Sequence, residues 1–320
     1  MTIKVIITEN FKELSKVAAE IVKEHIIQGL QNKEEYVLGL ATGNSPTGMY
    51  KNLAQIANSG EIDSTRIRSF NLDEYVGLPG ENSQQRMLHP ESYCYFMIQE
   101  FFGLLDKKFI ETSVPYGCLI DQKQLVSELE AHPEDWSELG IDAGKSISIK
   151  DKPDSVYLKW IRETILEGYA QKISAAGGID LHIIGVGGRG HVAFHESGIP
   201  FEKSNVLLVK LDDNTVANAV KDGHFATKDE SPRYAISMGA ELVYKAKAVL
   251  LLANGERKVE SVTKSLLNIP SPDIPISYGQ IYSKNGGNLT YVLDKIAGRE
   301  LLANKELLKK KGIEIEIRNS

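Results

Sequence analysis

The fold is indicated most clearly by the stretch Asp180-Leu-His-Ile-Ile-Gly-Val-Gly-Gly-Arg-Gly-His-Val-Ala-Phe-His-Glu196. It begins with a short apolar run, Leu181 to Ile184, whose length and isoleucine content are typical of a buried strand. Four glycines follow within six residues, and they let the backbone turn tightly and approach a ligand. His191, His195 and Glu196 come next. A strand followed by bare backbone and titratable groups predicts a site at the carboxyl end of an α/β sheet.

Strands and helices alternate along most of the chain. The expected strands are Lys4–Ile7, Tyr36–Leu40, Arg66–Leu72, Leu181–Ile184, Val206–Leu211 and Ala248–Leu252. The expected helices are Phe11–Gly29, one that begins at Asn44-Ser45-Pro46, Pro90–Phe102, Leu158–Ala176 and Gly255–Leu267. This spacing predicts a doubly wound α/β fold with a mainly parallel sheet and helices on both faces. We expect a single domain over residues 1–320.

Two segments interrupt the alternation. Gly80–Leu88 is polar with few apolar residues, and Asp121–Asp154 is acidic, contains two prolines and lacks clear periodicity. We therefore expect an irregular insertion at about residues 120–154. Three roles fit such a segment: a surface excursion, a lid over a site, or a contact with another subunit. A homo-oligomer is therefore left open.

Composition and charge exclude several classes of partner. The net charge is −6, and the only basic run, Lys309-Lys310-Lys311, is interpreted as the end of a helix. We expect no nucleic acid or membrane partner, because both attract clustered lysine and arginine. The two cysteines, Cys94 and Cys118, form no C-x-x-C pair, so we expect free thiols and no zinc site. No apolar run approaches the ~20 residues of a membrane span, and a cytoplasmic protein is expected.

The glycine segment also matches the dinucleotide-binding pattern G-x-G-x-x-G, through Gly185, Gly187 and Gly190. In that pattern the glycines open a helix whose N-terminus faces the pyrophosphate. Here Gly198 and Pro200 end the segment after about two turns, too soon for such a helix. We therefore expect no nicotinamide or flavin cofactor.

A second loop is suited to bind phosphate. Thr42, Gly43, Asn44 and Ser45 follow one strand and open a helix, so backbone N–H groups and the positive helix end point at the same place. Lys258, at the start of another helix, is placed to supply a countercharge. An ordinary capped helix start is the alternative. Together with the other strand-end loops, this loop favours a phosphorylated small molecule as ligand.

Acid–base residues follow two of the expected strands. Asp73 and Glu74 come after one strand, so one of them is expected to face the same crevice and the other to point away. A carboxylate there can remove a proton next to a carbonyl, whereas a helix N-cap is the alternative role. His191 with Glu196 suits a general acid or base oriented by a carboxylate, and a structural histidine is its alternative.

At these residues the chain resembles the glucosamine-6-phosphate deaminase family, within a wider superfamily that includes 6-phosphogluconolactonase. The matching motifs are Leu38-Gly-Leu-Ala-Thr-Gly-Asn-Ser-Pro-Thr-Gly-Met-Tyr50, Phe70-Asn-Leu-Asp-Glu-Tyr-Val-Gly-Leu-Pro79, His89-Pro-Glu-Ser-Tyr93 and Gly185–Glu196. The resemblance implies conversion of an amino-sugar 6-phosphate to fructose 6-phosphate and ammonia, without metal or redox cofactor.

The resemblance also implies roles for particular residues. Asp73 would move a proton between C2 and C1 of the open-chain sugar. His191 would serve the ring oxygen during ring opening, and Glu196 would support it. The family's second supporting carboxylate falls at the position of Arg189 in this chain. The implied substrate-binding residues are Thr42, Gly43, Asn44, Ser45, Gly187, Gly188, His195 and Lys258.

The chain departs from the family pattern within the same motif. Arg189 stands where the family usually has an aspartate, and His195 where it has an asparagine. Arg189 thus reverses the sign of a charge near His191, and it is suited to clamp an acidic group of a substrate. Three hypotheses are kept: a deaminase of hexosamine 6-phosphates, an isomerase or lactonase acting on another sugar phosphate, and a non-catalytic sugar-phosphate sensor.

Overall fold

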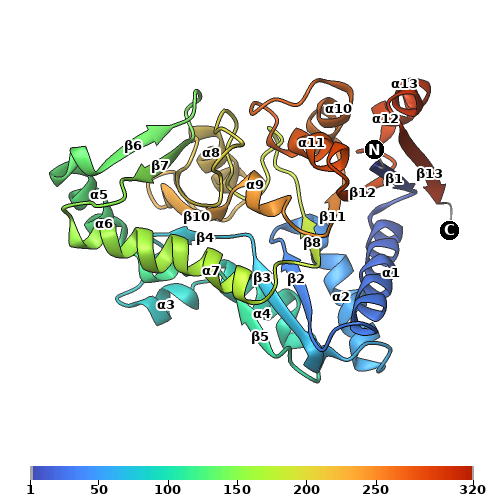
Figure 1. Ribbon diagram of the computed structural model, residues 1–320, viewed down its shortest axis with the longest axis horizontal. Helices are drawn as coiled ribbons and strands as arrows, with labels where there is room; N and C mark the ends of the chain where they lie inside the picture. Colours follow the sequence, from blue (N-terminus) through green and yellow to red (C-terminus); the bar gives the residue numbers. More distant parts are fainter. Residues whose placement is uncertain (1–2, 319–320) are drawn as a thin grey trace.

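The computed structural model describes residues 3–318, which form strands and helices in near alternation (Figure 1). The strands are β1 (Ile3–Thr8), β2 (Tyr36–Leu40), β3 (Ile67–Asn71), β4 (Asp73–Val76), β5 (Glu111–Ser113), β6 (Trp136–Leu139), β7 (Lys145–Ile149), β8 (Leu181–Ile184), β9 (Val206–Lys210), β10 (Tyr234–Met238), β11 (Ala248–Ala253), β12 (Asn288–Asp294) and β13 (Ile313–Arg318). The helices are α1 (Phe11–Leu30), α2 (Asn44–Asn58), α3 (Ser83–Met87), α4 (Tyr93–Glu100), α5 (Gln122–Ala131), α6 (Val156–Trp160), α7 (Gly168–Ala175), α8 (Asp213–Lys221), α9 (Ala240–Val243), α10 (Val259–Leu267), α11 (Tyr278–Lys284), α12 (Arg299–Ala303) and α13 (Lys305–Lys310).

The larger sheet has eight strands in the order β13-β1-β12-β11-β8-β2-β3-β5. All of its neighbouring strands pair in parallel. β8, the strand of the opening stretch, lies between β11 and β2, so chain segments distant in sequence meet beside it. The expected doubly wound, mainly parallel α/β fold is confirmed.

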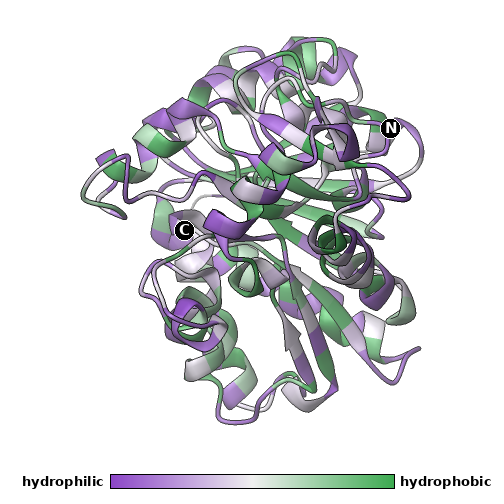
Figure 2. Ribbon diagram, turned by 90° about the vertical axis from the view of Figure 1, so that its left-hand side faces the viewer, coloured by the Kyte–Doolittle hydropathy of each residue, from purple (hydrophilic) through white to green (hydrophobic). Residues whose placement is uncertain are grey.

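Both faces of this sheet are buried, which explains the continuous apolar runs of its strands. Ile183 of β8 packs in the core formed with α1, α2 and α4, whereas the next residue, Ile184, packs in the core on the opposite face. Leu250 and Leu251 of β11 divide in the same way. Figure 2 shows the central strands as the most hydrophobic part of the molecule, with hydrophilic residues concentrated on the surrounding helices and loops.

A second sheet of five strands, in the order β4-β10-β9-β7-β6, is antiparallel throughout. The strand expected at Val206–Leu211 is present as β9, but it belongs to this sheet and not to the parallel one. A parallel connection usually needs a crossover helix, and the residues between β8 and β9 contain none. Because sequence alternation alone cannot reveal strand partners, the second sheet was not expected.

The segment expected to be irregular, at about residues 120–154, contains α5, β6 and β7. The expectation of irregular structure is therefore wrong for most of its length. β6 is an edge strand with mostly exposed residues, so it has no apolar alternation to detect. The helix expected at Leu158–Ala176 is present as α6, a π-helical segment at Ile161–Glu167, and α7.

The structure also describes the basic run near the end of the chain and the two cysteines. Lys309 and Lys310 lie in the last turn of α13, as the interpretation of the basic run requires. Cys94 is half-buried and Cys118 buried, and both are free thiols. Within residues 3–318, no helix combines the length and apolar character needed to cross a bilayer.

Candidate functional site

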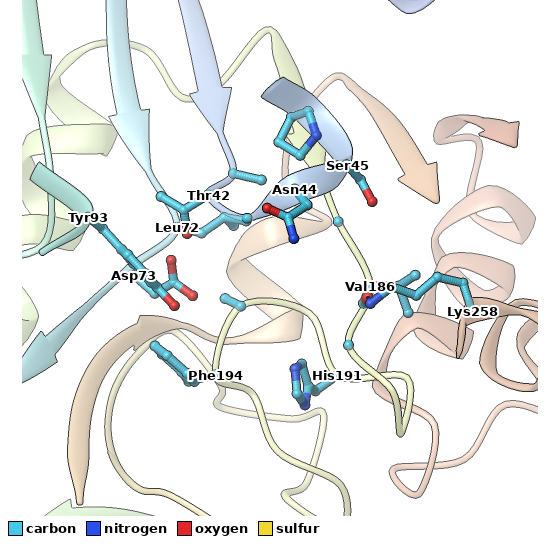
Figure 3. Close-up of a pocket in the computed structure, with 16 residues that line it drawn as sticks. Thr42, Asn44, Ser45, Leu72, Asp73, Tyr93, Val186, His191, Phe194 and Lys258 are labelled. Atoms are coloured by element: carbon cyan, nitrogen blue, oxygen red, sulfur yellow. The ribbon is translucent and has the colours of Figure 1, made fainter. Parts of the chain in front are cut away.

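The candidate site is formed after four neighbouring strands of the parallel sheet, β11, β8, β2 and β3. Since they run in parallel, the loops that follow them open at the same edge of the sheet. These loops line one cavity of about 170 Å³. Its lining comprises Ala41, Thr42, Gly43, Asn44, Ser45, Pro46, Leu72, Asp73, Tyr93, Gly185, Val186, Gly187, His191, Ala193, Phe194 and Lys258. The structure therefore brings together residues from all the motifs singled out in the sequence (Figure 3).

Asp73 lies where the chain passes from the parallel sheet to the antiparallel one. The preceding residue, Leu72, donates its N–H to Leu40 of β2 and accepts an N–H from Met238 of β10. The Asp73 side chain is buried, and its Oδ1 has no hydrogen-bond partner among the described residues. Burial and the charge of Glu74 raise the pKa of Asp73 well above its usual range, while a hydrogen bond from Thr42 opposes the shift.

Glu74 points away from the cavity and holds the start of α4. Its carboxylate accepts hydrogen bonds from the N–H groups of Tyr75, Tyr93 and Cys94 and from the hydroxyl of Ser92. Burial raises the pKa of Glu74, although these hydrogen bonds act in the opposite direction. The two adjacent carboxylates thus face opposite sides of the strand, one in the cavity and one at a helix start.

His191 projects into the cavity (Figure 3), and Glu196 contacts it from outside the cavity lining. The His191 Nδ1 and Glu196 Oε2 atoms are 3.4 Å apart, and the Glu196 side chain is only 3% exposed. Burial alone would raise the pKa of Glu196, but interactions with His191, Thr215 and the N–H of Asp212 lower it below its usual value. Glu196 is thereby kept ionised, as a carboxylate that orients an imidazole must be.

Gly187 lets the His191 ring lie directly against the backbone. A Cβ at Gly187 would stand 1.8 Å from Nε2 of His191, far inside van der Waals contact. A Cβ at Gly188 would meet no atom within 4 Å, and Gly188 does not line the cavity. A side chain at Gly187 would therefore displace the His191 ring, whereas one at Gly188 would not.

The other end of the cavity is suited to an anion. Gly43, with φ of +95°, precedes the 15-residue helix α2, and no side chain caps the N–H groups of its first turn. Ser45 of that turn donates its hydroxyl to Oδ1 of Asn254, 2.8 Å away. Lys258 lies in the short 3-10 turn that leads into α10, and its ammonium donates to the carbonyl of Val186 at 2.6 Å. The pKa of Lys258 is lowered, chiefly by burial. No carboxylate of residues 3–318 lies within 4.0 Å of the Lys258 ammonium.

Four residues expected in the site, Gly188, Arg189, His195 and Glu196, lie outside the cavity lining. His195 is fully buried; Nδ1 accepts from the N–H of Ala240 and Nε2 contacts the carbonyl of Ile199. Burial lowers the pKa of His195 to about 4, so the ring is neutral. Arg189 instead pairs with Asp142 and Asp212, which leaves its guanidinium occupied by carboxylates of the chain itself.

Sequence reasoning missed two aromatic residues of the cavity wall, Tyr93 and Phe194. Their rings stack with centroids 5.9 Å apart and planes inclined by 6°. Both residues stand inside motifs that were singled out, but their orientation depends on contacts between α4 and the loop after β8. An aromatic residue in a motif gives no sign of whether it faces a core or a cavity.

The chain is similar over nearly its whole length to curated glucosamine-6-phosphate deaminases. The protein from Clostridium acetobutylicum is 33% identical over 298 residues, which cover 93% of this chain and 100% of the relative. The one from Halothermothrix orenii is 33% identical over 296 residues, 92% of this chain and 98% of the relative. No protein-family model matches the chain. By this similarity, the chain belongs to the glucosamine-6-phosphate deaminase family.

Solved structures agree with this assignment at the level of the fold. One described as a monomeric glucosamine-6-phosphate deaminase of the NagB superfamily has a TM-score of 0.67 and 26% identity, covering 92% of this chain and 98% of the other. A 6-phosphogluconolactonase from Trypanosoma brucei has a TM-score of 0.58 and 15% identity, covering 93% and 98%. The second comparison supports a shared fold alone.

Proposed function

We propose that this protein converts glucosamine 6-phosphate and water into fructose 6-phosphate and ammonia. The observation that carries the proposal is the arrangement of one cavity with an acid–base end and an anion-binding end. Asp73 lies on one side and Lys258 on the other, and the start of α2 and His191 line the cavity between them (Figure 3). The membership of the chain in the deaminase family supports the same substrate class.

The anion-binding end holds the 6-phosphate. The free N–H groups of the first turn of α2 donate to phosphate oxygens, and the helix dipole favours their negative charge. The Lys258 ammonium adds a charge-assisted hydrogen bond from the start of α10. With the phosphate held there, the opposite end of the sugar chain, C1 and C2, is directed toward Asp73 and His191.

The acid–base end then carries the proton transfers. His191, oriented by Glu196, serves the ring oxygen as the pyranose opens. Asp73 removes the proton from C2 of the open-chain aldehyde and returns it to C1, while a proton passes from the amino group to O1. This leaves a hydroxyl group at C1 and an imine at C2. Water adds to that carbon and ammonia leaves, so the ketone of fructose 6-phosphate forms. A raised pKa makes Asp73 a stronger base than an exposed aspartate.

A small sugar phosphate is the partner that this site implies, and the free thiols of Cys94 and Cys118 fit a reducing compartment such as the cytoplasm. Asp142 and Asp212 already balance the charge of Arg189, so this guanidinium is not reserved for an acidic substrate group. A substrate with an additional acidic group is therefore not favoured.

The test is release of ammonia from glucosamine 6-phosphate by the purified protein. We expect turnover by the parent chain and a loss of about 10²- to 10⁴-fold in kcat for Asp73→Asn, the usual contribution of a general base. The matched control is Asp229→Asn, a change at an exposed carboxylate, which should leave kcat unaltered. Binding without ammonia release would favour a sensor, and hydrolysis of 6-phosphogluconolactone instead would favour a lactonase.

A further inference from the structure

The turn between β6 and β7, Gly140–Gly144, packs on the segment that carries His191 and Glu196. The N–H of Ile141 donates to the carbonyl of Gly198, 3.1 Å away. A Cβ at Gly144 would stand 2.6 Å from Cβ of Glu196, so the turn touches Glu196 directly. The acidic segment of the sequence thus reaches the back of the candidate active site.

Arg189 connects the same turn to the site through ion pairs with two carboxylates. One edge of its guanidinium pairs with Asp142 of the turn, and its Nη1 donates to Oδ2 of Asp212 at 2.9 Å. Hydrogen bonds from Arg189 and from the N–H of Ala143 lower the Asp142 pKa, which keeps the carboxylate ionised. Asp142 is therefore held within the turn by the N–H of Ala143, and its ionised carboxylate pairs with Arg189.

Asp212 completes the connection to Glu196. Its side chain is buried at the start of α8, where it accepts the N–H of Asn214 at 2.6 Å. Its own N–H points to Oε1 of Glu196, 3.3 Å away. A buried carboxylate is costly without a countercharge, and Arg189 supplies one. A continuous chain of contacts therefore runs from Asp142 through Arg189 and Asp212 to Glu196, and from Glu196 to His191.

We propose that the β6–β7 turn is a positioning element for the reaction, in which Asp142 acts through Arg189 to hold Glu196 and His191 in their working geometry. This inference rests on the proposed deaminase function. None of the three residues Asp142, Arg189 and Asp212 lines the cavity, so they position the reacting groups and do not touch the substrate. The charge of Arg189 is balanced by two carboxylates, and both come from segments outside the matching motifs.

The first test is kinetic. Asp142→Asn should lower kcat about 10-fold with KM nearly unchanged, because a misplaced acid–base pair slows chemistry while the phosphate end still binds. Asp142→Glu should restore most of the loss. The matched control is Asp151→Asn, which breaks the exposed Asp151–Arg162 pair near the end of β7 and should change neither constant. Parent-like kcat in Asp142→Asn, or a rise in KM alone, would overturn the proposal.

A double-variant cycle tests whether Asp142 acts through Arg189. Arg189→Gln alone should lower kcat at least as much as Asp142→Asn, and the double variant should lose no more than Arg189→Gln does. Independent, multiplicative losses would contradict the connection. Hydrogen exchange of residues 187–198 supplies a readout that needs no turnover: Asp142→Asn should speed it, and Asp151→Asn should not. Faster exchange in a chain that releases no ammonia would reject the deaminase function and keep the structural connection, whereas unchanged exchange would reject the connection itself.

Discussion

At the scale of single residues, Asp73 and Glu74 are adjacent in the chain but their carboxylates have different surroundings. Both are buried carboxylates, but Glu74 accepts four hydrogen bonds at the start of α4, whereas Oδ1 of Asp73 lacks a partner among the described residues. An unsatisfied buried carboxylate costs stability and is kept where function needs it. Asp73 is therefore the residue at which activity and stability should oppose each other.

Asp73→Asn should stabilise the protein at neutral pH. The pKa of Asp73 is raised in the folded state, so folding favours its protonated form, and the parent loses stability as pH rises from the unfolded value of about 3.9 through the folded one. Asparagine does not titrate, so the variant avoids this loss. The Tm of the variant should exceed that of the parent by ~2 °C at pH 8 and match it below about pH 4. An equal difference at both pH values would show that ionisation of Asp73 is not the cause.

Lys258 tests the phosphate end of the cavity. Lys258→Gln should raise KM for glucosamine 6-phosphate about 10- to 100-fold, the range for a lost hydrogen bond to a charged group, with a smaller change in kcat. Steady-state kinetics measures both constants. Lys264→Gln, which removes an exposed lysine paired with Glu260, should leave KM unchanged. A kcat loss without a KM change would place Lys258 in the chemical step.

At the scale of elements, the loop after β8 depends on one close approach. Gly187 and Gly188 are adjacent, but only Gly187 has the His191 ring against it. The loop is fixed further by hydrogen bonds from Gly187 N–H to the His191 carbonyl and from Gly190 N–H to the Gly187 carbonyl, both 3.0 Å long. The glycine at position 187 thus makes room for the His191 ring.

Gly187→Ala should lower kcat by about 10²-fold, because a methyl group would displace the His191 ring. Gly188→Ala places the methyl in open space away from the cavity lining, and we expect near-parent kinetics. The comparison of kcat and Tm for the two variants separates a local effect on His191 from a general effect on the loop. Equal losses in both variants would contradict the close-contact explanation.

At the scale of the whole molecule, the site lies where two sheets meet. Leu72 bonds to β2 of the parallel sheet and to β10 of the antiparallel one, and Asp73 follows it directly. The antiparallel sheet also supplies the β6–β7 turn that contacts Glu196. Both sheets therefore contribute to the position of the acid–base residues.

Leu208, fully buried in β9, tests how strongly the second sheet is joined to the core. Leu208→Ala should lower the free energy of unfolding by about 2 to 5 kcal/mol through lost burial and the cavity that remains. Val156→Ala, at a side chain that is 82% exposed, should change it by less than about 0.5 kcal/mol. Urea unfolding measures both, and a small effect at Leu208 would mean that the second sheet packs loosely.

The sequence by itself determined the parallel sheet, the loops that carry the site and the family. Those features are local: a strand buried on both faces is a continuous apolar run, and the motifs follow such runs directly. Asp73, His191, Lys258 and the Thr42–Ser45 loop were predicted to share one site, and all line one cavity.

Only the tertiary structure decided the antiparallel sheet, the orientation of Asp73 against Glu74, the burial of His195 and the partners of Arg189. Each depends on contacts between residues far apart in the chain: Asp142 and Arg189 are separated by 47 positions, and His195 and Ala240 by 45. Pairing across such distances follows from how whole elements pack, and no local pattern of residue types records it. The physical reason is that burial and charge compensation depend on the assembled fold and not on any single segment.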